Sequence, residues 1–151
     1  QRGLWSVQHV VFLIILCYGC VISSFGLSQV NVIEQHGATI VQKALRGKMI
    51  LAPLTRGGNL PFRRLCADFG METSMSEMIY ARSLLRGDAV EQARLRRACN
   101  EKTFGVQIAT NGIEEGRQAI EEAAKAGADF VDLNCGCPIH EATRRGLGSS
   151  L

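Results

Sequence analysis

The sequence lacks a strong excess of charge of either sign. Its 151 residues carry 17 Lys and Arg against 14 Asp and Glu, which gives a formal net charge of +3. A charge this small does not predict a nucleic-acid partner, although a polyanion would meet little general repulsion. Charge therefore leaves the class of partner open.

The sequence also lacks the paired cysteine framework of a small secreted domain. Its six cysteines are scattered through apolar or helical stretches, which fits a reducing compartment. Cys17 and Cys20 have the spacing of a redox or zinc half-site, and Cys135 and Cys137 have His140 nearby. Because neither group has a second cluster to complete a tetrahedral site, we expect no structural metal, and we interpret Cys17 and Cys20 as buried thiols.

No apolar run is long enough for a confident membrane span. The run from Val10 to Ile22 has the length of a signal-peptide core, and small residues follow it. Three interpretations of residues 1–47 stay open: a secretory leader, an anchor that contacts a membrane through residues 10–27, or a non-native piece joined to the body. Nothing in this apolar leader and bridge suggests chemistry, and it ends in a weakly patterned stretch that could form a short helix.

The sequence has ordinary globular composition, with 46% hydrophobic residues. From Lys48 onward, strand-like and helix-like segments alternate. Short apolar runs predict strands at 49–52, 73–78, 104–109 and 129–134, the first of them buried. Helical patterns predict helices at about 60–69, at 88–99, and from 111 to the stop at Gly127. Strand–helix repeats with short connections predict an α/β fold with a parallel sheet, and four such units make half of a (β/α)8 TIM barrel.

The ends of two helices carry capping signals. Asn59 is expected to cap the helix at 60–69, and Asn111 with Glu114 has the spacing of a capping box. In the helix that follows, the apolar face is expected to lie on the sheet. Its predicted members are Ile113, Ile120, Ala123, Ala124 and Gly127.

The residues that suggest chemistry stand at or near the carboxyl ends of the predicted strands, where such barrels place their reactive groups. Gln107 lies inside an apolar strand, so its amide needs neighbouring backbone or a ligand as a partner. Asn134 and Cys137 follow the fourth strand, and a thiol, which is mostly protonated at neutral pH, can serve as a general acid. A buried loop cysteine is the alternative. The glycine-rich stretch 144–150 could cradle a phosphate or form a solvated basic turn.

Five segments together resemble the dihydrouridine synthase family, over residues 48–151. They are Leu-Ala-Pro-Leu-Thr-Arg-Gly-Gly-Asn-Leu-Pro-Phe-Arg-Arg at 51–64, Ser-Glu-Met at 76–78, Phe-Gly-Val-Gln at 104–107, and Asp-Leu-Asn-Cys-Gly-Cys-Pro-Ile at 132–139 followed by Gly-Leu-Gly-Ser-Ser-Leu at 146–151. The Ala-Pro-Leu-Thr and Cys-Gly-Cys-Pro-Ile motifs are most similar to those of the eukaryotic type-three branch, which modifies a uridine in the variable loop of tRNA. That branch usually carries zinc fingers ahead of the barrel, and none is visible here.

The resemblance implies a set of roles. Pro53, Leu54 and Thr55 would line FMN, and Gln107 would hydrogen-bond its ring. Asn134 would position flavin or uracil, and Cys137 would protonate the uracil ring. The expected reaction is reduction of FMN by NADPH or NADH, followed by reduction of an extruded tRNA uridine to 5,6-dihydrouridine.

The resemblance further implies that residues 48–151 are the N-terminal half of the FMN-binding barrel. The family's flavin-phosphate site, its catalytic-face lysine and histidine, and its RNA-binding domain would follow Leu151, so we expect this stretch alone to be inactive. A cytoplasmic or nuclear location is expected. Two alternatives remain: a flavin barrel that acts on a free pyrimidine, similar to dihydroorotate dehydrogenase, and a truncated, non-catalytic remnant.

Overall fold

A parallel β-sheet organises the chain. The structure, a computed structural model, describes residues 12–13, 41–42 and 45–151. Its strands run in the order β1 (Phe12–Leu13), β6 (Phe130–Leu133), β5 (Thr103–Ala109), β3 (Thr73–Met75) and β2 (Ile50–Leu51), and β4 (Ile79–Tyr80) also pairs with β5. Every pair is parallel. The predicted α/β architecture with a parallel sheet is therefore confirmed.

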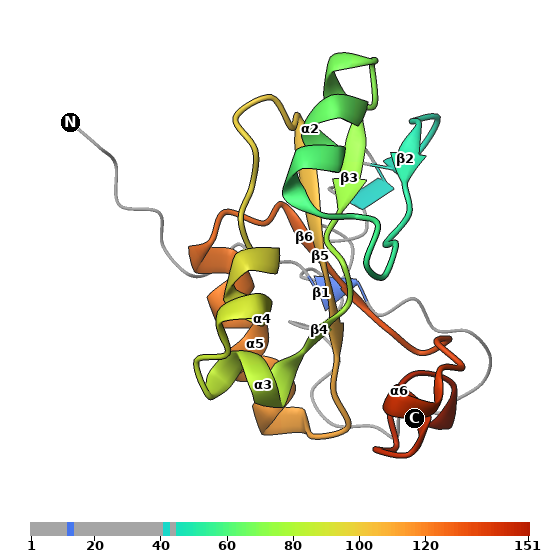
Figure 1. Cartoon of the computed structure of the whole chain (residues 1–151), viewed down its shortest axis with the longest axis vertical. Helices are drawn as coiled ribbons and strands as arrows, with labels where there is room; N and C mark the ends of the chain where they lie inside the picture. Colours follow the sequence, from blue (N-terminus) through green and yellow to red (C-terminus); the bar gives the residue numbers. More distant parts are fainter. Residues whose placement is uncertain (1–11, 14–40, 43–44) are drawn as a thin grey trace, which may run out of the picture.

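Helices connect the strands, as Figure 1 shows. They are α2 (Leu60–Asp68), α3 (Ala81–Leu85), α4 (Ala89–Arg94) and α5 (Ile113–Lys125), while α6 (His140–Thr143) and a 3-10 turn η2 at Gly148–Ser150 follow the last strand. In the described part of the chain, no helix combines the length and apolar character that a membrane crossing needs.

The main core lies between strand β5 and helices α3 and α5. Phe104, Val106 and Ile108 alternate along β5 and pack with α3 and α5 side chains, Leu84 and Ala119 among them. Because successive side chains of a strand point to opposite faces, Gly105 and Gln107 lie on the other face of β5. A Cβ atom at Gly105 would collide with the Phe130 ring, so glycine permits that ring to cross the strand. The polar site described below is on this second face.

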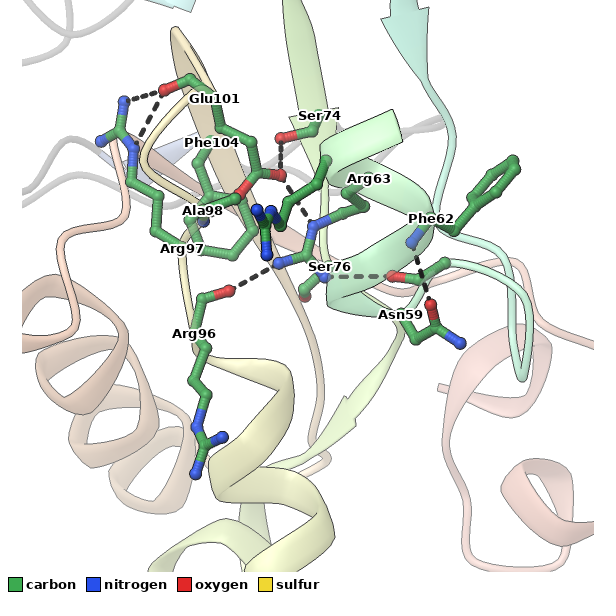
Figure 2. A network of polar contacts seen from close by, with 12 residues as sticks. Asn59, Phe62, Arg63, Ser74, Ser76, Arg96, Arg97, Ala98, Glu101 and Phe104 are labelled. Atoms are coloured by element: carbon green, nitrogen blue, oxygen red, sulfur yellow. Dashed lines mark hydrogen bonds and ion pairs between the residues drawn. The ribbon is translucent and has the colours of Figure 1, made fainter. Parts of the chain in front are cut away.

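A buried ion pair joins α2 to the sheet. Arg63, which is 1% exposed, donates from Nε to Oε1 of Glu101 at 2.8 Å. The same guanidinium donates to the carbonyl oxygens of Gly58 and Arg96 and lies 4.9 Å from the centroid of the Phe104 ring. Figure 2 shows Glu101 accepting in addition from the hydroxyl of Ser74 on β3, at 2.6 Å. Every polar group of the pair is thus hydrogen-bonded, which a buried charge requires.

Several local predictions are confirmed. The Asn59 side chain caps α2 by accepting from the Phe62 N–H, and the predicted third and fourth strands appear as β5 and β6 with ends moved by a residue. Within the predicted strand at 73–78, only residues 73–75 form a strand, β3, and the separate strand β4 begins just after that range. The predicted helix at 88–99 is the shorter α4, which Asp88 caps. The short helix α3 was not predicted.

Three other local predictions are wrong. The strand predicted at 49–52, observed as β2, lies at one edge of the sheet that the described strands form and is not buried, since Met49 and Ile50 are 67% and 41% exposed. Asn111 and Glu114 do not form a capping box, because the N-cap of α5 is Gly112 and the Asn111 amide donates to the carbonyl of Arg145. Of the face predicted to lie on the sheet, Ala123 is buried and Ile120 packs against the core, but Ile113 is 95% exposed, because the buried face of α5 begins at Gly116.

The predicted leader lies mostly outside the described residues. Its described part is β1, whose backbone pairs Phe12 with Val131 and Leu13 with Asp132 at the β6 edge of the sheet. No strand was predicted there. The weakly patterned stretch at the end of residues 1–47, where a short helix was expected, also falls mostly outside the described residues.

Candidate active site

Polar side chains from β5, β6 and the loop after β6 form a network of hydrogen bonds, here called the relay. The Gln107 amide nitrogen donates to Oδ2 of Asp132 at 2.7 Å, and its carbonyl oxygen accepts from the Asn134 amide at 2.9 Å. The strand register sets Gln107 opposite Asp132, which brings these side chains together across the sheet. The glutamine predicted to need partners therefore finds them in two neighbouring side chains.

The relay continues into the loop between β6 and α6, residues 134–139, here called the cysteine loop. The Asn134 side-chain oxygen accepts from the backbone N–H of Cys137 at 3.0 Å and of Gly136 at 3.3 Å. Cys137 is half-buried and packs on a small cluster that includes Met78 and Leu147, whereas Cys135 is exposed. Three predicted site residues, Gln107, Asn134 and Cys137, are thus joined in one network, and Cys137 has the more enclosed thiol.

Two members of the network were not predicted as site residues. Asp132 anchors the relay, and the Ser76 hydroxyl oxygen, just past β3, accepts from the Gln107 backbone N–H at 3.1 Å. Burial raises the pKa of the Asp132 carboxyl above its usual range, and the hydrogen bond from Gln107 partly opposes that shift. Each is the first residue of a motif that carries the resemblance, at 76–78 and 132–139, and no other signal in the sequence marked them as site residues.

The remaining predicted site residues are Pro53, Leu54 and Thr55, which follow the end of β2. The Leu54 carbonyl oxygen accepts from the N–H groups of Gly57 and Gly58, which closes a tight turn. The buried Glu77 carboxylate accepts from the Arg56 N–H at 3.0 Å and so ties this loop to the end of β3. In the part of the chain described, no hydrogen bond joins residues 53–55 to the relay. Leu54, 42% exposed, leaves an apolar surface at this loop.

The glycine-rich stretch after α6 supports the cysteine loop. The Ser149 N–H donates to the Cys137 carbonyl oxygen at 3.1 Å. Gly148 has φ +61°, and a Cβ atom there would overlap that carbonyl oxygen and lie 3.1 Å from the Cys137 Cβ. Only glycine fits this backbone conformation at this approach. The observed role of the stretch is to hold Cys137 in place, and phosphate binding by it remains a prediction.

Replacing Gly148 by alanine should therefore displace the Cys137 loop. We expect the rate of the Cys137-dependent reaction in the full-length protein to fall about 10- to 100-fold, since a shift of roughly 1 Å in a reacting group can have that effect. The matched control is Gly136→Ala in the same loop, where an added Cβ has no neighbour within 4 Å. Steady-state turnover of both variants is the measurement. Equal rates for the two variants would contradict a supporting role for Gly148.

In the described residues, no group of three or more His, Cys, Asp and Glu side chains is placed to hold a metal ion.

Comparison with known proteins connects this arrangement to one family. The family described as dihydrouridine synthase (Dus) matches residues 50–151. A tRNA-dihydrouridine(47) synthase of Coprinopsis cinerea is 47% identical over 109 residues, which are 70% of this chain and 16% of that protein. Proteins with this name and the suffix "-like" are 43% identical in Arabidopsis thaliana and 42% identical in Homo sapiens, over 70% and 71% of this chain.

The match covers most of this chain but only a small part of each relative. The chain spans about a sixth of the length of the curated relatives, 16% of the Arabidopsis thaliana protein and 17% of the Homo sapiens protein. All three names also specify NAD(P)(+). The matched region contains the relay, the cysteine loop and the loop after β2.

Proposed function

Because the chain belongs to the dihydrouridine synthase family, whose fold is the (β/α)8 barrel, we propose that the full-length protein reduces a uridine of tRNA to 5,6-dihydrouridine. FMN is the bound cofactor in this proposal, and NADPH or NADH is the reductant. The observation that carries the proposal is the network that joins Gln107, Asn134 and Cys137 at the carboxyl ends of β5 and β6.

The residues present fit a flavin ring. A side-chain amide nitrogen has two hydrogens, and the relay uses one from Gln107 and one from Asn134, so each retains a donor. These donors match the carbonyl oxygens and ring nitrogens of an isoalloxazine, and exposed Leu54 offers apolar surface for such a ring. Pro53, Leu54, Thr55 and Gln107 would hold the ring. Asn134 would position the ring or the uracil.

The reaction adds a hydride and a proton across the C5–C6 double bond of uracil. FMN, when bound and reduced by the nicotinamide, supplies the hydride to C6. Cys137 gives its thiol proton to C5 and is then reprotonated from solvent. The protein thus contributes orientation and a positioned acid. Asn134 fixes the acid by holding the Cys137 N–H, and Gln107 with Asp132 fixes Asn134.

The substrate is a base in a folded RNA, so the uridine must leave its stack to reach Cys137. A location in the cytoplasm or nucleus, where tRNA is processed, is part of the proposal. We propose no role in this chemistry for residues 1–47.

The test is to follow the flavin of the full-length protein. NADPH should bleach the yellow flavin band, and unmodified tRNA transcript should restore it within the turnover time. Free uridine and orotate should not restore it. Rapid recovery with orotate would instead favour an enzyme that acts on free pyrimidines, and a protein purified without flavin that takes up no FMN would contradict the proposal.

A further inference from the structure

A basic pocket lies next to the cysteine loop and has no role in the chemistry described so far. Its volume is about 390 Å³, and it is lined by α3 and the residues flanking it, by the end of β5 with the start of α5, and by the loop after α6. Three arginines and one carboxylate line it: Arg82, Arg86, Arg145 and Glu115. The pocket therefore has an excess of positive charge, which favours an anionic ligand.

The arginines are available to different degrees. Arg82 pairs with Glu115 at 2.9 Å, although its side chain is 65% exposed. Arg145 pairs with Glu141, a residue that does not line the pocket. Among the described residues, the exposed guanidinium of Arg86 has no hydrogen-bond partner. Arginine's planar set of donors binds phosphate oxygens in pairs, so an unpaired Arg86 beside two other arginines suits a phosphate group.

Aromatic and amide groups complete the lining. The Arg145 guanidinium lies 5.0 Å from the centroid of the Tyr80 ring, and the Asn111 amide donates to the Arg145 carbonyl. A stacked arginine and tyrosine are the side chains on which unpaired RNA bases stack. The volume is near the small end of the range of about 300–1,000 Å³ for ligand pockets, which suits one nucleotide unit better than a dinucleotide.

The pocket is also close to the proposed proton donor. Tyr80 and Cys137 pack against one buried cluster of Met78, Ala109, Ala142 and Leu147, and both Ala109 and Leu147 line the pocket as well. A uridine drawn out of its stack toward Cys137 brings its neighbouring backbone with it. A phosphate beside that uridine would therefore arrive near these arginines.

We propose that the pocket lined by Tyr80, Arg82, Arg86, Asn111 and Arg145 holds a backbone phosphate of the RNA strand next to the uridine that reacts at Cys137. This inference rests on the proposed function. It assigns the pocket to substrate RNA and not to the phosphates of the nicotinamide nucleotide.

Substitution of the pocket arginines in the full-length protein tests the inference. In Arg86→Gln and Arg145→Gln, we expect the affinity for unmodified tRNA transcript to fall about 5- to 20-fold. The slope of log affinity against log salt should decrease in magnitude by about 0.7 to 1 for each phosphate that the variant no longer neutralises. Arg86→Lys should keep most of the slope because it keeps the charge. The KM for NADPH in flavin reduction should not change in any variant.

The control is Arg64→Gln, which removes an exposed arginine of α2 outside the pocket. It should leave affinity and salt slope unchanged. Wild-type affinity and slope in both pocket variants would overturn the inference, as would a raised KM for NADPH with normal tRNA binding. If wild-type protein forms dihydrouridine while the pocket variants bind normally, only the pocket assignment fails. If wild-type protein forms none, the proposed function itself fails.

Discussion

Cys137→Ala should lose dihydrouridine formation and keep its flavin. General acids contribute about 100- to 10,000-fold to a rate, so we expect a loss of that size in the rate of tRNA reduction. The flavin half-reaction with NADPH should be unchanged, because the thiol serves only the protonation of C5. Single-turnover oxidation of the prereduced enzyme by tRNA, set beside NADPH-driven flavin reduction, separates the two steps.

The matched control is Cys135→Ala, two residues earlier in the same loop. Cys135 is exposed, whereas the Cys137 N–H is held by the Asn134 side chain at 3.0 Å. Near-normal turnover is expected for the control. An equal loss in both variants, or turnover in Cys137→Ala within tenfold of wild type, would remove Cys137 from its role as proton donor.

Arg63→Ala should destabilise the protein by about 3–5 kcal/mol, the range for removing one partner of a buried ion pair. The reason is that Glu101, with its side chain 0% exposed, would keep a buried charge without its cation. The Gly58 and Arg96 carbonyl oxygens would also lose their donor. Urea unfolding of the full-length protein measures the change in the free energy of unfolding.

Two further variants make this prediction specific. Arg64→Ala changes the neighbouring exposed arginine on the same helix and should not measurably alter unfolding. The double variant Arg63→Ala with Glu101→Ala should be much less destabilised than the sum of its single changes, because the two groups interact directly. Additive effects, or a loss below about 1 kcal/mol in Arg63→Ala, would show that the buried pair is not a main stabilising contact.

The parts of the fold that could be predicted from sequence are those whose signals are local. Local signals of this kind are Asn59 before α2, Gly127 after α5, and the apolar runs of β5 and β6, each recognisable from adjacent residues. One error arose where a distant residue binds the same side chain. Asn111 has the sequence spacing of a capping residue, but its amide bonds to Arg145, which is 34 positions away.

The same distinction applies to the candidate site. Gln107 stood out because an amide in an apolar strand needs partners, and Cys137 because of its loop. Asp132 did not, because its importance depends on the register that sets it opposite Gln107. Arg63 and Arg64 look alike in the sequence, and only packing shows that one is buried and the other exposed. Burial of a charge and cross-strand pairing are properties of the assembled sheet.

The most direct test of the central claim is the product itself. Unmodified tRNA transcript incubated with the full-length protein, FMN and NADPH should contain one uridine that has gained two hydrogens, as detected by mass spectrometry of nuclease fragments. Parallel incubation with Cys137→Ala should leave that uridine unreduced. A flavin-loaded, NADPH-reducible protein that leaves every tRNA uridine unchanged would contradict the account.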